Sequence, residues 1–323
     1  MFEPVVLRSS ARAKVNLALA VTGVRADGYH VLRSVFLRLE LADTLSLADS
    51  LTPDGPDQLL IDGDADCPVA DNLVLRAIVA FRSAAGGSPV PGVVVRLRKR
   101  IPMATGLAGG STDAAATLCL LAARFPDSAA GVDLRALAAG IGADVPFFVD
   151  GAGAAVVTGV GETIDPLPPP VAPVGVLLCA PAGGASTPRV FRAWDELPGD
   201  ARSSGDAGRA VDDLAHLLRS GADPVTLADH AAHLRAANDL WLPAAAVTLG
   251  LTALRDDLER RLQRPVLLTG SGSTLFALYP SAQAAVDVGR QLLTETSFAM
   301  TRVIATQSSG PHPQPITSDR RHP

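Results

Sequence analysis

Hydrophobic and polar residues recur along the first half of the chain with two different periods. Alternation with period two predicts strands over residues 4–22, 31–47 and 93–102. Hydrophobic residues at helical spacing predict a helix over residues 71–85. Strong helix formers predict a second helix over 113–125, and residues 133–142 are expected to form a third that ends on glycine. Asp71 immediately precedes the hydrophobic positions of the first helix and is its expected N-cap. Residues 147–167 alternate around glycines, which predicts paired strands joined by glycine turns.

The second half of the chain repeats this mixture beyond a proline cluster at 166–173, the expected linker. Further strands are predicted over residues 174–181 and 301–307, and two strands around a glycine turn over 265–280. Further helices are predicted over residues 209–220, 226–238, 244–262 and 281–296. Residues 308–323 have no apolar periodicity, so we expect a disordered tail.

Strands and helices are mixed without strict βαβ alternation, which favours the α+β class. The linker divides the chain into two predicted domains, residues 1–165 and 174–307. The 323 residues are 48% hydrophobic and 19% charged, so the chain can bury a large core and is not globally disordered.

The 28 basic residues include only two lysines, Lys14 and Lys99. A general bias toward arginine would replace any lysine that supplies only a positive charge. Lys14 and Lys99 are therefore candidates for sites that need a compact ammonium group. Neither lysine follows a glycine, which excludes a P-loop nucleotide-binding motif.

Net charge and composition exclude several other classes. A net charge of −5 and only 4% aromatic residues argue against nucleic-acid binding. The three cysteines, Cys67, Cys119 and Cys179, are too far apart for a zinc or disulfide framework. The N-terminus lacks a secretory signal, and the longest apolar run, 171–182, is interrupted by proline and too short for a membrane span. We therefore expect a cytoplasmic protein that binds neither membrane nor nucleic acid.

A glycine-rich loop at 105–112 leads directly into a predicted helix. Such a loop turns backbone N–H groups toward one point, and the helix adds its positive end, so the segment suits a phosphate group. The alternative is an ordinary turn capped by Ser111. Lys99 lies on the preceding strand, where it could meet the same phosphates or remain a solvated charge in the run RLRKR.

Two further segments place polar residues in apolar surroundings. Lys14 and Asn16 lie two residues apart on one face of a predicted strand, which suggests the floor of a polar pocket or, alternatively, an edge-strand charge. Asp144 lies between a helix-ending glycine and a predicted hydrophobic strand that contains Pro146. A carboxylate there needs a cation or hydrogen-bond donors, unless it only caps the next element.

Aromatic and glycine-containing segments give weaker signals. Tyr29 and His30 could recognise a planar base, although aromatic residues near turns usually serve packing. Residues 269–274 form a second Gly/Ser turn that could shape a site or simply join two strands. His230 and His233 share a helix face without a third ligand, so a surface pair is favoured over a metal site.

Taken together, these segments resemble a known enzyme family. Residues 102–116, PMATGLAGGSTDAAA, closely resemble the second motif of the GHMP kinases, and residues 268–278 resemble the third. AKVNLAL, DGYH, GADVPFF and AANDL are similar to the branch that phosphorylates a cytidine-diphosphate-linked sugar alcohol in the non-mevalonate isoprenoid pathway. The resemblance extends from about Ala11 to Gln307.

The resemblance implies a fold, a reaction and roles for individual residues. It implies a ribosomal-S5-like N-terminal domain with a left-handed βαβ crossover, a ferredoxin-like C-terminal domain and a site in the cleft between them. The γ-phosphate of ATP would pass to the 2-hydroxyl of the sugar alcohol. Asp144 would be the base or orienter, and Lys14 would favour its ionised form and stabilise the transferring group. Asn16 would hold the substrate, and Mg²⁺ is expected with ATP, its ligands left open.

The remaining implied contacts are to the two nucleotide groups. Tyr29, His30 and Phe191 would contact the cytosine, with Thr187 nearby, and Asn72 would lie at the adenine. The ATP phosphates would be held by Lys99, Pro102, Met103, Ala104, Thr105, Gly106, Leu107, Ala108, Gly109, Gly110, Ser111 and Thr112.

The chain departs from the family pattern at three points. Ala108 replaces a glycine, so its backbone must avoid positive φ or be strained. Thr112 replaces a serine but keeps a hydroxyl. Asn238-Asp239 is followed by LWLP instead of an acidic-proline continuation, which leaves the role of that segment open.

Two alternative functions remain at this point. One is a GHMP kinase acting on homoserine, mevalonate or a sugar, and DGYH together with Phe191 argues for a base-bearing substrate instead. The other is an inactive family member that serves as a binding or regulatory module. The presence of Lys14, Asp144 and the glycine loop argues against it.

Overall fold

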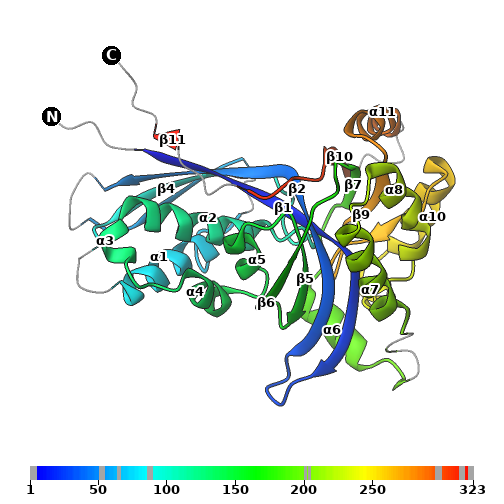
Figure 1. The fold of residues 1–323 in the computed structure, drawn as a ribbon, viewed down its shortest axis with the longest axis horizontal. Helices are drawn as coiled ribbons and strands as arrows, with labels where there is room; N and C mark the ends of the chain where they lie inside the picture. Colours follow the sequence, from blue (N-terminus) through cyan, green and yellow to red (C-terminus); the bar gives the residue numbers. More distant parts are fainter. Residues whose placement is uncertain are drawn as a thin grey trace.

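The computed structural model describes residues 6–50, 55–63, 67–85, 90–199, 202, 205–294, 300–312 and 317–318. These residues form two halves, each built around one sheet (Figure 1). The first half contains β1 (Leu7–Val24), β2 (His30–Asp49), β3 (Gln58–Asp62), α1 (Leu73–Ala84), β4 (Val93–Arg98), α2 (Gly109–Arg124), α3 (Pro126–Ala129), α4 (Leu134–Ile141), α5 (Val145–Asp150), β5 (Ala154–Gly159) and β6 (Thr163–Leu167).

The second half follows the proline cluster, which connects β6 to the next strand. It contains β7 (Gly175–Pro181), α6 (Thr187–Asp195), α7 (Asp206–Arg219), α8 (Pro224–Leu234), α9 (Trp241–Val247), α10 (Leu251–Leu262), β8 (Leu267–Leu268), β9 (Leu275–Tyr279), α11 (Ala282–Leu293) and β10 (Thr301–Gln307). β11 (Thr317–Ser318) returns to the first half and pairs with β1.

A long antiparallel hairpin of β1 and β2 forms the backbone of the first sheet, whose path is β11-β1-β2-β4-β3. β5 pairs with β2, and β6 pairs with β5. β3 and β4 are parallel and are connected through α1, so they form the expected βαβ unit; its left-handed crossover stays a prediction. Figure 1 shows the hairpin running from the first half down alongside the second.

The second sheet is antiparallel in the order β10-β7-β9-β8. The two sheets with their helices confirm the predicted α+β class. One hydrophobic cluster joins the halves, because it contains Val15 of β1 and Leu37 of β2 together with Leu178 of β7, Leu214 of α7 and Phe276 of β9. The hairpin thus provides core residues to both halves.

Two predictions around helix starts are wrong. Asp71 has a φ of 59°, and Asn72 is the N-cap of α1, accepting from the Val74 N–H. Residues 147–150 belong to helix α5 and not to a strand, because Pro146 favours the first helical turn and Gly151, with a φ of 82°, ends it.

Two other boundaries differ from the predictions. The helix after the glycine loop begins at Gly109 and not at residue 113. The single helix expected over 244–262 is two helices, α9 and α10, separated by Gly250 with a φ of 77°.

The expected disorder of the tail is wrong for residues 308–312. Ser308 and Ser309 are each 4% exposed, and the Ser308 backbone and hydroxyl both bond to Val174. Residues 313–316 and 319–323 lie outside the described residues.

Candidate active site

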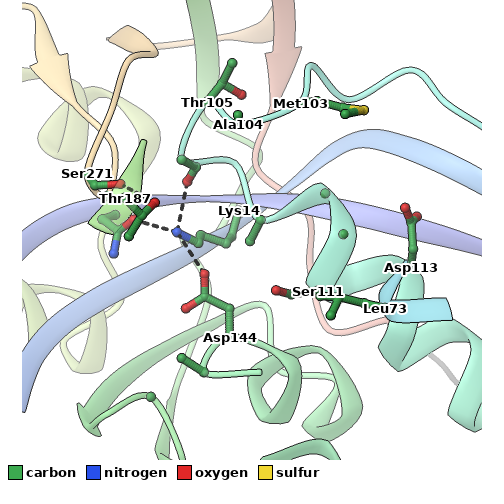
Figure 2. Close-up of a pocket in the computed structure, with 18 of the residues that line it drawn as sticks. Lys14, Leu73, Met103, Ala104, Thr105, Ser111, Asp113, Asp144, Thr187 and Ser271 are labelled. Atoms are coloured by element: carbon green, nitrogen blue, oxygen red, sulfur yellow. Dashed lines mark hydrogen bonds and ion pairs between the residues drawn. The ribbon is translucent and has the colours of Figure 1, made fainter. Parts of the chain in front are cut away.

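A cavity of about 520 Å³ lies between the glycine loop, the β1–β2 hairpin and the second half (Figure 2). Most of the residues singled out in the sequence line it: Lys14, Asn16, Asn72, Lys99, Pro102, Met103, Ala104, Thr105, Gly106, Ala108, Gly109, Gly110, Ser111, Asp144, Thr187 and Phe191. Four do not line it: Tyr29, His30, Leu107 and Thr112.

Lys14 is buried at the floor of this cavity, on β1, and is only 3% exposed. Its ammonium donates to Asn16 Oδ1 at 2.7 Å and to the Gly106 carbonyl at 2.9 Å, and lies 3.4 Å from Asp144 Oδ2. Burial lowers the pKa of Lys14, although the nearby Asp144 opposes that shift. The alternative of an edge-strand charge is wrong, because the side chain lies in the interior.

Asp144 occupies the N-cap position of α5, and its side chain makes no capping hydrogen bond. The side chain is 29% exposed and faces the cavity and Lys14 (Figure 2). The alternative that Asp144 only caps the next element is therefore wrong. A carboxylate that is open to a cavity and paired with one buried ammonium can accept a proton from a bound hydroxyl group.

Asn16 is held by three side-chain hydrogen bonds to protein groups around Lys14. Its Oδ1 accepts from Lys14 and from Thr269 Oγ1 at 3.2 Å, and its Nδ2 donates to Ser34 Oγ at 2.9 Å. The Asn16 backbone N–H also donates to Thr269 Oγ1 at 3.0 Å. Through these contacts Asn16 fixes the position of the Lys14 ammonium.

The glycine loop contains two residues with left-handed backbone conformations that matter for the site. Gly106 has a φ of 81°, and a Cβ there would lie 2.3 Å from the Thr269 carbonyl, so only glycine fits. Ala108 has a φ of 58° and is the N-cap of α2. An alanine in this conformation is strained by about 1–2 kcal/mol. The backbone at Ala108 therefore does not avoid positive φ, and the expected strain is present.

The first turn of α2 provides the N–H groups that the sequence assigned to a phosphate. Gly109, Gly110 and Ser111 open this helix and line the cavity. The first intrahelical bond is donated by Thr112 N–H to the Ala108 carbonyl at 3.0 Å, and the N–H groups before it need partners outside the helix. This end of the cavity therefore attracts anions.

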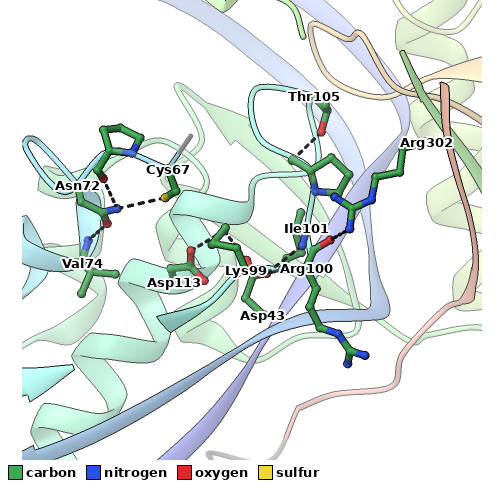
Figure 3. A network of polar contacts seen from close by, with 12 residues as sticks. Asp43, Cys67, Asn72, Val74, Lys99, Arg100, Ile101, Thr105, Asp113 and Arg302 are labelled. Carbon is green, nitrogen blue, oxygen red and sulfur yellow. Dashed lines mark hydrogen bonds and ion pairs between the residues drawn. The ribbon is translucent and has the colours of Figure 1, made fainter. Parts of the chain in front are cut away.

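Lys99 lies beneath the loop and is 7% exposed, so the alternative of a solvated charge is wrong. Its ammonium contacts Asp43 and lies 2.8 Å from Asp113 Oδ2 (Figure 3). Burial opposes the charge on Lys99, but Asp113 and Asp43 outweigh it and raise its pKa. Burial, partly offset by Lys99 and reinforced by Asp43, raises the pKa of Asp113 to about 7. Lys99, Asp43 and Asp113 form a buried triad under the loop.

Asn72 uses its amide mainly within the chain. Its oxygen caps α1, and its Nδ2 donates to the Pro68 carbonyl at 3.0 Å (Figure 3). The residue still lines the cavity next to Cys67 and Pro68. It therefore shapes this part of the wall through the turn that it holds.

Of the three residues expected to contact a base, the structure brings His30 and Phe191 together and places Tyr29 outside the cavity. His30 and Phe191 stack with ring centroids 4.5 Å apart, and Phe191 lines the cavity. His30 Nε2 lies 2.8 Å from Asp195 Oδ1, and Trp194 packs edge-on against the same ring. Tyr29 is 65% exposed at the tip of the hairpin and does not line the cavity.

Thr187 and Ser271 connect the second half to the cavity. Their hydroxyls lie 2.9 Å apart, one at the start of α6 and the other in the Gly/Ser turn at 269–274 (Figure 2). That turn therefore shapes the site as well as joining β8 to β9.

The segment Asn238-Asp239 holds this turn against β1. Asn238 Nδ2 donates to the carbonyls of Leu268 and Gly270, both at 3.0 Å. Asp239 Oδ2 accepts from the Val21 N–H at 2.9 Å. The sequence left the role of Asn238-Asp239 open. In the structure these two residues hold the Gly/Ser turn and β1 together by hydrogen bonds.

Sequence reasoning missed Asp43, Asp113, Thr269 and Asp195. Asp113 follows the glycine loop directly, and its position in GGSTD was a usable signal. Asp43 had no signal in the sequence. It contacts Lys99 because β2 pairs with β4, which is a tertiary contact.

The described residues contain no group of three or more His, Cys, Asp or Glu side chains that could hold a metal ion by themselves. Within the same ranges, no helix combines the length and apolar character that crossing a bilayer requires.

Comparison with known proteins relates the chain to kinases of one type. Residues 72–152 match the family model "GHMP kinases N terminal domain". A 4-diphosphocytidyl-2-C-methyl-D-erythritol kinase of Deinococcus radiodurans is 38% identical over 295 residues, covering 87% of each chain. That of Polaromonas sp. JS666 is 37% identical over 281 residues, 84% of this chain and 82% of the relative.

Solved structures show the same relationship. A crystal structure of 4-(cytidine 5'-diphospho)-2C-methyl-D-erythritol kinase superposes with a TM-score of 0.69 and 34% identity, covering 94% of this chain and all of that one. Methanococcus jannaschii mevalonate kinase superposes with a TM-score of 0.67 at 12% identity, covering 94% of this chain and 98% of that one, a likeness of fold alone.

Proposed function

Because the chain belongs to the 4-diphosphocytidyl-2-C-methyl-D-erythritol kinases of the GHMP kinase family, we propose that its cavity places ATP and the diphosphocytidyl sugar alcohol on either side of Lys14 and Asp144. The chain is a phosphotransferase, and ATP is its phosphate donor. The 2-hydroxyl of the sugar alcohol is the acceptor.

Asp144 accepts the proton of the 2-hydroxyl as the oxygen of that group attacks the γ-phosphorus of ATP. The new O–P bond forms while the bond from the γ-phosphorus to the β,γ-bridging oxygen breaks, and ADP leaves. Lys14, 3.4 Å from Asp144, pairs with the carboxylate and stabilises negative charge on the transferring group. Asn16 acts as a positioning residue, since its amide holds the Lys14 ammonium.

The ATP phosphates lie on the loop 102–112 and the first turn of α2, where the helix N-terminus favours negative charge. Asn72 shapes the wall at the adenine. Mg²⁺ bound with ATP would supply neutralisation of charge on the phosphates. The Ser111 hydroxyl and the Asp144 carboxylate, both of which line the cavity, would be the oxygen donors that hold it.

The cytosine binds at the other end of the cavity, against Phe191. His30 supports Phe191 from behind by stacking at 4.5 Å, and Asp195 fixes the His30 ring. Thr187 and Ser271 offer hydroxyls to the diphosphate or sugar alcohol.

The observation that carries this proposal is the pairing of a buried Lys14 with an accessible Asp144 at the floor of the cavity. Release of ADP, measured with the diphosphocytidyl substrate and separately with mevalonate, homoserine and galactose, tests it. We expect turnover with the first substrate only. Turnover of another substrate without the first would refute the assignment, and turnover of none would favour an inactive family member.

A further inference from the structure

A second, small cavity of about 20 Å³ is lined by Thr112, Ala115, Ala116 and Cys119 of α2, none of which lines the ATP cavity. β1, β2, α2, α5 and the segment 308–312 supply its walls. It has room for a single atom-sized ligand or one water, and none for a phosphate or nucleotide. Its distinguishing feature is a buried arginine.

Arg38 of β2 lines this cavity and is 2% exposed. Its Nη2 donates to the Phe147 carbonyl at 3.2 Å, and its Nε has no partner among the described residues. The rings of Phe147 and Phe148 lie 5.2 and 5.6 Å from the guanidinium carbon. Within the described ranges no carboxylate forms an ion pair with Arg38, although arginine is rarely fully buried without one.

The charges nearest Arg38 do not compensate it. Burial, followed by the like charge of Arg12, lowers the pKa of Arg38 to about 10. Glu40 is engaged by Arg12 at 3.1 Å. On the facing segment, His312 Nε2 lies 2.9 Å from the Ser10 carbonyl, and its buried Nδ1 has no partner among the described residues. The described lining of the cavity therefore contains one buried cation and three hydroxyl groups, those of Ser9, Ser10 and Thr112, but no carboxylate.

We propose that this cavity binds one small monovalent anion of the size of chloride, held by Arg38. A water molecule there would satisfy the Nε–H but would leave the buried charge uncompensated, which is unfavourable in an apolar interior. Cation–π contacts with the two phenylalanines offset only part of that cost.

An anion in this cavity would lie against the first turn of α2, because Thr112 belongs to that turn. Thr112 lines the small cavity, whereas its neighbours Ser111 and Asp113 line the ATP cavity. A bound anion therefore holds β2, α2, α5 and the segment 308–312 together directly behind the phosphate loop. The expected consequence is a fold that chloride stabilises at constant ionic strength.

Bromide is the direct probe, because it replaces chloride and gives an anomalous diffraction signal. We expect a bromide peak within hydrogen-bond distance of Arg38 Nε in crystals of the full chain grown without other halides. An ordered water at that position, with no anomalous peak, would overturn the proposal. This measurement needs no variant, so it stands even if substitutions at Arg38 prevent folding.

Thermal unfolding in sodium chloride and in sodium gluconate at equal ionic strength gives an independent test. For a dissociation constant of about 10 mM, about 200 mM chloride should raise the melting temperature by about 2–4 °C relative to gluconate. Arg38→Met should lose this difference, whereas Arg33→Gln, a partly exposed arginine on the same strand, should keep it. An equal chloride effect in all three proteins would count against the site.

Discussion

The two lysines of the chain are both buried beside carboxylates, but their surroundings differ. Lys14 has one accessible carboxylate, Asp144, at 3.4 Å, and its environment is open to a ligand. Lys99 is enclosed by Asp43 and Asp113 and has its charge balanced within the protein. The lysine beside an accessible partner is the one proposed for the chemistry, and the enclosed lysine is proposed to support the phosphate loop.

Replacement of Asp144 by Ala removes the proposed proton acceptor. Because positioned acid–base groups contribute roughly 10²–10⁴-fold, we expect kcat to fall by about that factor while the affinity for ATP stays within about threefold. Steady-state kinetics and ATP titration measure both quantities. Asp165→Asn, at an exposed ion pair, is the matched control and should keep full activity. A near-normal kcat in Asp144→Ala would refute the base role.

Replacement of Lys14 by Arg keeps the charge but changes its shape. The ammonium fits between Asn16 Oδ1 at 2.7 Å and the Gly106 carbonyl at 2.9 Å, and a planar guanidinium is bulkier and directs its donors differently. We expect kcat to fall about 10²-fold or more, a loss in the range of one electrostatic contact to the transition state. Circular dichroism separates this loss from misfolding. If Lys14→Arg kept most of its kcat, a positive charge at this position would be sufficient for catalysis, and the need for a compact ammonium would be contradicted.

Asp113 makes stability depend on pH through its raised pKa of about 7. The folded protein keeps a proton on Asp113 that the unfolded chain releases near pH 4, so this stabilisation is present at low pH and is lost as pH rises toward 7. Relative to Asp113→Asn, the wild type should lose up to about 1.4 kcal/mol of unfolding free energy per pH unit between about pH 5 and 7. Urea unfolding of both proteins across that range measures the difference. A difference that is constant with pH would contradict the shift.

At the scale of elements, the start of α2 is held by contacts on several sides. The Lys99 triad lies beneath it, and the Thr269 carbonyl allows only glycine at position 106. Asn238 fixes the turn that carries Thr269. The loop is therefore positioned by residues from both halves, and a change at Ala108 alone should not displace it.

Ala108→Gly tests the strain at this helix start. Glycine adopts a φ of 58° without steric cost, so we expect the unfolding free energy to rise by up to about 1 kcal/mol, with activity retained. Ala123→Gly, at an exposed position of the same helix, should instead destabilise by about 0.5–1 kcal/mol. Denaturant unfolding measures both. Equal destabilisation by the two substitutions would show that Ala108 is not strained.

At the scale of the whole molecule, the two halves share one core. β1 and β2 supply buried residues to a cluster that also contains residues of β7, α7 and β9. The segment 308–312 returns from the second half to the first, and the His312 N–H bonds to the Gly151 carbonyl. If one half unfolded, buried residues of the other half in this shared cluster would become exposed.

The shared core predicts that the halves unfold together. Cys119 of α2 and Cys179 of β7 are both buried, one in each half, so each reports on its own half when a thiol reagent is present. We expect both cysteines to become reactive at the same denaturant concentration, as resolved by mass spectrometry of the labelled peptides. Two separate midpoints would show that the halves are independent units.

The sequence alone determined most of the strands and helices, the glycine loop and the two residues proposed for catalysis. Periodicity is a local property, so it identified β1, β2, α1 and β7 within a few residues. The motifs around Lys14 and Asp144 are also local, which is why both were found without coordinates. The prediction of a strand at 147–150 was wrong because a short apolar run is compatible with a strand or a helix. Pro146 and Gly151 favour the helix that the structure contains.

Only the tertiary structure decided which side chains meet. Asn16 and Thr269 are 253 positions apart, and Lys99 and Asp43 are 56 apart, and no local pattern encodes such contacts. Chain topology also turned Phe191 into the cavity while leaving Tyr29 at the exposed tip of the hairpin. The burial that lowers the pKa of Lys14, and that leaves Arg38 without a carboxylate partner among the described residues, arises in the same way, because it depends on packing between distant segments.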